Sequence, residues 1–147
     1  MQKIIIGSDH AAFEAKEILK KTLEAQGFEL DDVGTHSLLS CHYPTYAVAV
    51  AKKMKEFPDA RGILICGSGI GVSIVANRFS YIRAALCRTA EEAKLARAHN
   101  DANVLCLGAR INSTAEIKNI TEAWLNAKFE GSRHQDRLNL FSTLGEK

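Results

Sequence analysis

"GILICGSGIGVSIVANRF", residues 62–79, decides the fold of this chain. An apolar run ends in Cys66, a loop with three glycines in five residues follows, and an apolar helical pattern begins at residue 71. A short apolar run bounded by glycine is typical of a buried strand, and the periodic pattern after it predicts a helix. The stretch therefore predicts a strand–loop–helix unit with a thiol at the mouth of a glycine loop.

The same alternation of strand and helix patterns extends to both ends of the chain. Further strands are predicted over residues 3–7, 28–34, 82–87 and 103–108, and helices lie between them, one of them over residues 46–57. Capping boxes are predicted at Thr89 with Glu92 and at Ser113 with Glu116. Strict alternation predicts parallel strands joined by right-handed crossovers. We therefore expect one three-layer α/β/α, Rossmann-like domain over residues 1–147, with a five-stranded parallel sheet and a C-terminal tail helix.

Composition narrows the class of protein. The chain has 147 residues and a formal net charge of +2, which gives no bias toward nucleic acid or a membrane surface. Four cysteines without a CxxC pair argue against a zinc site or a disulfide framework, and favour reduced thiols in a cytoplasmic protein. No signal peptide is expected, and no apolar stretch approaches the roughly 18 residues of a membrane span.

Polar clusters next to the strands are the candidate site. Ligands of parallel sheets bind at the carboxyl ends of the strands. We assign four clusters to those ends: Asp9 with His10, Cys66 with its glycines, His99 with Asn100, and Arg110. Beyond residue 130, a short tail helix would place Arg133 and Arg137 on one side. Its apolar residues Leu140, Phe141 and Leu144 would need burial, for which a partner subunit is expected.

The glycine loop admits several chemical interpretations. A strand, a glycine loop and a helix N-terminus together form an anion site, although glycines can also serve only a tight turn. The GSGIG spacing departs from the dinucleotide fingerprint and follows the third strand instead of the first. A Walker A loop lacks its Lys-Ser/Thr pair, and Val72 stands where a cysteine phosphatase needs arginine.

Proton transfer accounts for more of the clusters. A helix N-terminus favours the thiolate form of a nearby thiol, and the N–H groups of the loop can stabilise an oxyanion, to which Ser68 adds a hydroxyl donor. Opening a cyclic sugar needs an acid–base group, for which His99 and His10 are candidates. Arginines 110, 133 and 137 would then clamp a phosphate.

Six motifs resemble one known family in register along nearly the whole chain. They are "GSDHAAF" at 7–13, "YPTYA" at 43–47, "GILICGSGIGVSIVANR" at 62–78, "AHNDANVL" at 98–105, "LGAR" at 107–110 and "EGSRHQDR" at 130–137. These motifs are similar to those of the type B ribose-5-phosphate isomerases, which belong with the lactose-pathway galactose-6-phosphate isomerase subunits. Ser68 stands where many members have threonine, and Ser132 where glycine is common. The lactose-pathway subunits each lack part of the residue set that this chain keeps.

The resemblance implies a reaction and a role for each matching residue. The reaction is the interconversion of ribose 5-phosphate and ribulose 5-phosphate through an enediolate, in the pentose phosphate pathway, without metal or cofactor. Cys66 would be the base that removes the proton, and His99 would open the ring. The resemblance also implies a homo-oligomer, a dimer or tetramer, whose sites draw on both subunits. The remaining substrate-binding positions are Asp9, His10, Tyr43, Gly67, Ser68, Gly69, Ile70, Gly71, Asn100, Arg110, Arg133 and Arg137.

Several alternatives stay open on the sequence alone. The substrate can be a five-carbon sugar phosphate or a six-carbon 6-phosphate of the allose or galactose type. Either His10 or His99 can dominate ring opening, and either subunit can supply each arginine. A phosphate- or nucleotide-binding module without enzymatic activity is the alternative from a different class, and it would need the glycine loop but not Cys66 together with His99.

Overall fold

The computed structural model describes residues 2–145, and its centre is one five-stranded sheet. The strand order is β2-β1-β3-β5-β4, and every neighbouring pair is parallel, which confirms the predicted parallel sheet. The sequence analysis did not predict that β5 lies between β3 and β4. The strands are β1 (Lys3–Ser8), β2 (Glu29–Asp32), β3 (Arg61–Cys66), β4 (Ala84–Leu86) and β5 (Val104–Gly108).

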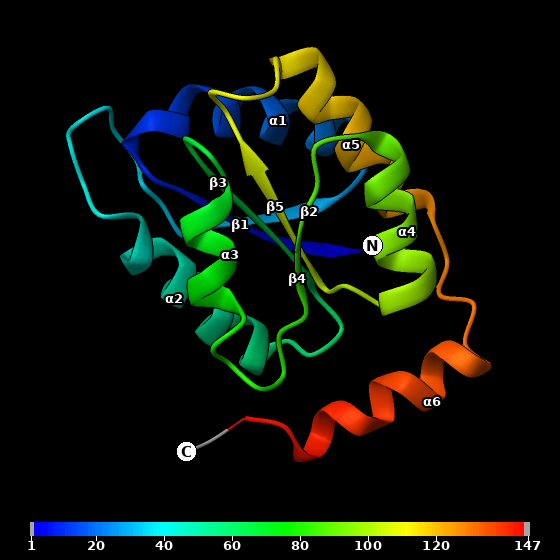
Figure 1. The fold of residues 1–147 in the computed structure, drawn as a ribbon. Helices are drawn as coiled ribbons and strands as arrows, with labels where there is room; N and C mark the ends of the chain where they lie inside the picture. The colour runs from blue at the N-terminus through cyan, green and yellow to red at the C-terminus, as the bar shows by residue number, and fades with distance from the viewer. Residues whose placement is uncertain (1, 146–147) are drawn as a thin grey trace.

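Helices cover both faces of the sheet, which confirms the three-layer expectation (Figure 1). Helices α1, α4 and α5 pack on one face, and α2 and α3 pack on the other. The helices are α1 (Phe13–Ala25), α2 (Tyr43–Glu56), α3 (Ile70–Ala76), α4 (Ala90–Asn100), α5 (Thr114–Asn126) and α6 (Arg133–Asn139). Two short 3-10 turns, η1 (His10–Ala12) and η2 (Leu140–Thr143), flank α1 and α6.

Successive side chains of a strand point alternately into two separate hydrophobic cores, one on each face of the sheet. Ile4 and Ile6 of β1 point into the core under α1, α4 and α5, whereas Ile5 points into the core under α2 and α3. All three are fully buried, as expected when a parallel strand is covered on both faces. This double burial explains the continuous apolar runs Ile4–Ile6 of β1 and Ile63–Cys66 of β3, whereas the edge strand β2 has the sequence ELDD and is only partly buried.

The start of α2 and the capping of α4 differ from the sequence expectations, and α3 spans Ile70–Ala76 instead of the predicted residues 71–79. Helix α2 begins at Tyr43, three residues before the predicted start, because Pro44 is accepted in the first turn. At α4, Thr89 Oγ1 accepts from the N–H of Glu92 at 3.1 Å, but the Glu92 carboxylate accepts from Arg88 instead. The predicted capping box at Thr89 is therefore only half formed. The reciprocal box of Ser113 and Glu116 is confirmed.

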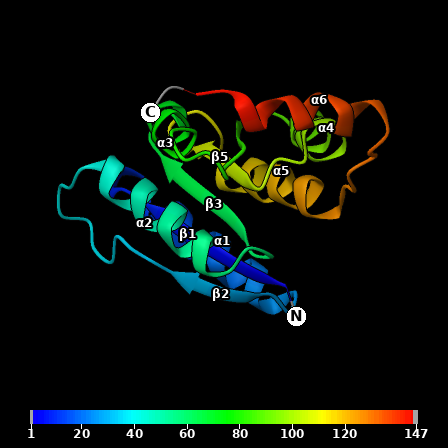
Figure 2. The same cartoon turned by 90° about the horizontal axis from the view of Figure 1, so that it is seen from below.

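Helix α6 and the segment after it lie outside the two cores. Figure 2 shows α6 running alongside α4, with the tail directed toward α3. Ser132 precedes α6 with a φ of 53°, a left-handed conformation that glycine adopts without cost. Leu140, Phe141 and Leu144 are 68%, 48% and 69% exposed, so their expected lack of burial within their own chain is confirmed. Within residues 2–145, none of the helices combines the length and apolar character that a membrane crossing requires.

A buried ion pair joins α1 to the end of β2. Lys16 is fully buried, and its Nζ donates to Asp32 Oδ2 at 2.6 Å, while Lys20 donates to the same oxygen at 2.7 Å. The backbone N–H of Gly34 donates to Asp32 Oδ1 at 2.9 Å. Burial by itself would raise the pKa of Asp32, but the hydrogen bonds from the two lysines outweigh it and hold that pKa below its usual value.

Replacing Asp32 with alanine should lower the free energy of unfolding by about 1.5–3 kcal/mol, because the buried Lys16 would lose its 2.6 Å hydrogen bond and keep only Glu17 Oε1 at 3.3 Å. Asp31→Ala is the matched control, since Asp31 pairs with Lys53 at the surface, and it should cost below about 1 kcal/mol. Urea unfolding at neutral pH measures both. The folded pKa of Asp32 lies below the unfolded value, so its stabilisation is present above about pH 4 and is lost as the pH falls further. Equal losses in the two variants would contradict this assignment.

Candidate functional site

A pocket opens at the carboxyl ends of β1, β3 and β5. Asp9 follows β1 and Cys66 ends β3, and these two strands are neighbours in the sheet. From β1 the chain continues to β2 on one side, whereas from β3 it continues to β4 on the other side. Such a reversal of strand order is where ligands bind in open α/β sheets. The pocket measures about 510 Å³, a volume suited to a small phosphorylated metabolite. It is lined by Asp9, Tyr43, Cys66, Gly67, Ser68, Ile70, Gly71, Ile74, Arg110 and Ile111.

Cys66 lies at the base of this pocket with a hydrogen-bond donor beside its sulfur. Its side chain is 4% exposed, and the backbone N–H of Gly69 donates to Sγ at 3.1 Å. This hydrogen bond holds the sulfur at the start of the glycine loop. Burial raises the pKa of Cys87 to about 12 and moves the pKa of Cys106 upward as well, so those two thiols stay protonated. Of the three buried thiols, Cys66 is the one that meets the pocket.

Two glycines of the loop are required for different reasons, Gly69 by its backbone conformation and Gly71 by the ring that packs against it. Gly69 has a φ of 78°, and a Cβ there would lie 2.7 Å from the Leu86 side chain and 2.9 Å from the Leu107 backbone. At Gly71 the ring of Tyr43 occupies the space that a Cβ would need. The glycine spacing therefore reflects close packing of the loop against β4, β5 and α2.

The loop uses two of its N–H groups internally. Gly69 donates to the Cys66 sulfur, and Ile70 donates to Ser68 Oγ at 3.1 Å. Fewer N–H groups can therefore bind an anion than the five of residues 67–71 that the sequence predicted. The N–H groups of Gly67, Ser68 and Gly71 remain as candidate donors to a ligand. Because Ser68 Oγ accepts from Ile70, its own O–H is free to donate.

The segment after β1 orients two of the predicted residues. Asp9 is 8% exposed, and its Oδ1 accepts from the N–H of Ala12 at 3.2 Å, which caps the η1 turn. His10 Nδ1 accepts from the backbone N–H of Cys41 at 3.1 Å. In the neutral ring this leaves the proton on Nε2. Tyr43 stands at the rim of the pocket, 38% exposed.

Arg110 supplies the positive charge of the pocket. Its backbone N–H donates to Gly67 O at 3.0 Å, and its guanidinium lies so near Gly67 that a Cβ there would be 3.1 Å from Nη1. Arg88, which follows β4, was missed in the sequence analysis. Its Nη1 is buried near Gly108, beside the backbone of Ser68. The signal was available, because Arg88 follows its strand just as Asp9 and Arg110 follow theirs.

His99 and Asn100 do not lie at this edge, so their predicted placement at the carboxyl ends is wrong. Helix α4 runs antiparallel to the strands, and its last turn therefore reaches the amino end of β5 (Figure 1). The register pairs Val104 with Gly62, and Gly108 with Cys66, so the two edges are separated by about 13 Å of strand. Within one chain, the pocket around Cys66 and the histidine of α4 face different edges of the sheet.

A second polar cluster has formed around His99. Its ring stacks on that of His134 with centroids 4.3 Å apart, and Glu130 Oε1 lies 3.6 Å from His99 Nε2 and 3.5 Å from His134 Nε2. Burial lowers the pKa of His134, and the positive charge of Arg133 lowers it further. Sequence reasoning missed Glu130 and His134, although both stand in the tail motif. Arg133 and Arg137 are exposed on α6, and neither they nor Arg110 pair with a carboxylate within residues 2–145.

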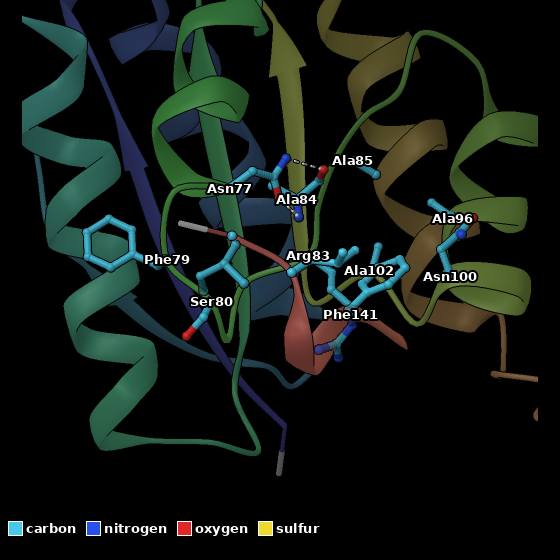
Figure 3. Close-up of a pocket in the computed structure, with 13 residues that line it drawn as sticks. Asn77, Phe79, Ser80, Arg83, Ala84, Ala85, Ala96, Asn100, Ala102 and Phe141 are labelled. Carbon is cyan, nitrogen blue, oxygen red and sulfur yellow. Dashed lines mark hydrogen bonds between the residues drawn. The ribbon is translucent and has the colours of Figure 1, made fainter. Parts of the chain in front are cut away.

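The apolar tail borders a further pocket of about 460 Å³, in which Phe141 and Asn100 face the segment from Asn77 to Ala85 (Figure 3). Arg83 is the titratable group in its lining, and that guanidinium is paired with Asp101 at 3.3 Å. The pocket is therefore suited to binding apolar side chains and has no free acid–base group among its described lining residues.

Comparison with protein families gives one match of high coverage. The family model described as Ribose/Galactose Isomerase matches residues 4–141. Ribose-5-phosphate isomerase B of Escherichia coli is 42% identical over 147 residues, which covers all of this chain and 99% of that protein. A relative from Rickettsia bellii, 45% identical over 92% of this chain and 94% of its own length, is described only at the level of a sugar phosphate isomerase.

Solved structures agree with the sequence comparison. A ribose 5-phosphate isomerase from Thermotoga maritima superposes with a TM-score of 0.94 at 43% identity, covering 97% of this chain and 99% of that one. Ribose-5-phosphate isomerase B from Mycoplasma genitalium, solved with bound ribulose 5-phosphate, gives a TM-score of 0.91 at 38% identity, with 97% of both chains covered.

Proposed function

Because this chain belongs to the ribose/galactose isomerase family and is a sugar phosphate isomerase, we propose that it interconverts ribose 5-phosphate and ribulose 5-phosphate. The observation that carries the proposal is a thiol that receives an N–H hydrogen bond at the base of a pocket also lined by Arg110, which has no carboxylate partner within residues 2–145. Base and phosphate-binding group thus share one cavity. A binding module would need the arginine and the loop, but not the thiol.

Cys66 is the base in this proposal. Its thiolate removes the proton from C2 of the open-chain aldose. The electrons of that C–H bond form a C1=C2 double bond, and the π electrons of the C1 carbonyl move to its oxygen, which gives an enediolate. The Ser68 hydroxyl and the remaining loop N–H groups donate to the enediolate oxygens. The hydroxyl proton of O2 then passes to O1, and the thiol returns its proton to C1, which leaves a hydroxyl at C1 and the ketone at C2. No metal or cofactor takes part in this scheme.

The second half of the site comes from another copy of the chain. His99 and Asn100 lie at the opposite edge of the sheet from Cys66, and α6 carries Arg133 and Arg137 on that same side. Side-chain rotation cannot close a gap of about 13 Å. A homo-oligomer in which the histidine edge of one subunit faces the Cys66 pocket of its partner brings ring opening and proton abstraction together. Exposed apolar residues on α3 and the tail, including Ile74 and Leu140, provide surface for such an interface.

An isomerase assay on a panel of sugar phosphates tests the reaction itself. We expect ribose 5-phosphate to be converted in metal-free buffer, with a kcat/KM at least tenfold above those of allose 6-phosphate and galactose 6-phosphate. Preference for a six-carbon substrate would move the protein to the other branch of its family. No conversion of any sugar phosphate would refute the isomerase assignment.

Arg137→Ala should raise the KM for ribose 5-phosphate by about 10- to 150-fold, because one charge-assisted hydrogen bond to the phosphate contributes about 1.5–3 kcal/mol. Arg78→Ala, which removes an exposed arginine outside the pocket lining and the tail, is the matched control and should leave KM unchanged. Initial rates over a range of substrate concentrations separate KM from kcat. A loss confined to kcat would count against phosphate binding by Arg137.

A further inference from the structure

The cluster at the end of α4 contains two side chains, Glu130 and His134, in addition to the His99 that proton transfer requires. His99 comes from the last turn of α4, Glu130 from the loop before α6, and His134 from the first turn of α6. Two imidazoles and one carboxylate form the ligand set of many open zinc sites, in which the fourth position is left to solvent or substrate.

The two carboxylate–imidazole distances within the cluster are close to those around a single ion. Glu130 Oε1 lies 3.6 Å from His99 Nε2 and 3.5 Å from His134 Nε2, and the three ligand atoms fall within 4.8 Å of one another. A tetrahedral zinc ion with bonds of about 2.0–2.2 Å holds its ligand atoms about 3.4 Å apart. The two carboxylate–imidazole separations are within a few tenths of an ångström of that value.

One ligand is already buried without a partner. His134 is 5% exposed, and its Nε2, buried and facing Glu130, makes no hydrogen bond among the described residues. Burying an imidazole nitrogen without a partner costs free energy, and an ion at this point would supply the missing interaction. The backbone N–H of Glu130 donates to Ala98 O at 2.9 Å, which holds the carboxylate-bearing loop against α4. The three side chains are therefore held close together before any ion arrives, and only the ring orientations have to change on binding.

We propose that His99, Glu130 and His134 form a binding site for a divalent transition-metal ion of the zinc type, and that its occupation inhibits the enzyme. Within one chain the side chains of His99 and Glu130 are 37% and 54% exposed. In the proposed oligomer the ion enters through the same opening as the sugar phosphate, because His99 faces the partner's pocket. The two rings are nearly parallel, so each tilts out of the stack to direct its lone pair at a shared ion. Inhibition follows because the metal takes the His99 lone pair that proton transfer needs. This second half rests on the proposed function, whereas the binding does not.

Calorimetric titration of the chelator-treated, full-length protein with ZnCl₂ tests the binding. We expect one ion per chain. Glu130→Gln and His134→Asn should each weaken zinc affinity by more than about 100-fold. The loss of a residue that only hydrogen-bonds a ligand typically weakens metal affinity by roughly 10- to 100-fold. His36→Asn, an exposed histidine outside the cluster, is the matched control and should bind as wild type does. Glu130 is exposed, so Glu130→Gln remains informative if His134→Asn fails to fold, which circular dichroism reveals.

The absorption spectrum of the Co²⁺-loaded protein identifies the ligands. We expect tetrahedral d–d bands without a thiolate-to-cobalt charge-transfer band. The competing site is His10 with Cys41, whose Sγ lies 3.8 Å from Nδ1. A thiolate band, or zinc binding lost in Cys41→Ser but kept in Glu130→Gln, would overturn the proposal, as would the absence of saturable binding.

Isomerase assays separate the inhibition from the binding. Zinc should inhibit the wild-type enzyme over the concentration range in which it binds. The Glu130→Gln variant should need at least a tenfold higher zinc concentration for the same fractional loss of isomerase activity. Binding without inhibition would overturn the inhibitory half. If the protein converted no sugar phosphate at all, calorimetry and the cobalt spectrum would still decide the binding half.

Discussion

Cys66→Ala should lower kcat for ribose 5-phosphate by at least about 10²–10⁴-fold, the usual contribution of a general base positioned at the reacting atom. The dissociation constant for ribose 5-phosphate should stay within about tenfold of wild type, or 1.4 kcal/mol, because the arginines and the loop remain in place. Rapid-quench measurements of a single turnover give the chemical step, and calorimetry gives the binding.

Cys87→Ala is the matched control for this experiment. Cys87 is as buried as Cys66, at 2% against 4% exposure, but it lies outside the pocket lining, and its pKa is raised to about 12. Its removal should cost stability without a comparable loss of turnover. Wild-type turnover by Cys66→Ala, or equal losses in the two variants, would remove Cys66 from the reaction.

Mixed oligomers should recover activity that neither parent variant has. Cys66→Ala and His99→Asn chains are each expected to be inactive alone. A dimer purified by two different tags, one on each variant, should show about half of wild-type activity, since one of its two shared sites holds both wild-type residues. The physical reason is that Cys66 and His99 lie at opposite edges of the same sheet.

A second mixture distinguishes shared sites from sites within one chain. A dimer of wild type with the double variant, Cys66→Ala and His99→Asn in one chain, should be inactive if each site takes one residue from each subunit. Sites within single chains would reverse both results, with half activity in this dimer and none in the first. Steady-state assays of the two purified dimers therefore decide the arrangement, and native mass spectrometry verifies their composition.

Much of the fold follows from local sequence. The alternation of strand and helix, the parallel sheet and the capping box at Ser113 depend on patterns a few residues long, and the structure confirms them. The glycine loop at the carboxyl end of β3 could also be predicted from a local pattern, because Cys66 and its neighbours stay adjacent in any strand–loop–helix unit. For this reason the loop residues of the pocket lining could be named from their spacing, whereas Tyr43 was named only through the family resemblance.

Strand order depends on long-range packing, and the sequence analysis did not predict it. The sheet places β5 between β3 and β4, which sets Arg110 over the glycine loop. Which strands pair is decided by how two apolar cores fill, and those cores draw side chains from the whole chain. Arg88 comes near the loop for the same reason.

The sequence by itself determined the elements, their parallel arrangement and the pocket around Cys66. Only the tertiary structure decided that His99 belongs to the opposite edge and that it meets Glu130 and His134 there. The physical reason lies in chain direction, since a helix that connects parallel strands starts at the carboxyl edge and returns to the amino edge. Residues close to a strand in sequence can therefore lie a full strand length from the site, and contacts between α4 and α6 form only when both pack.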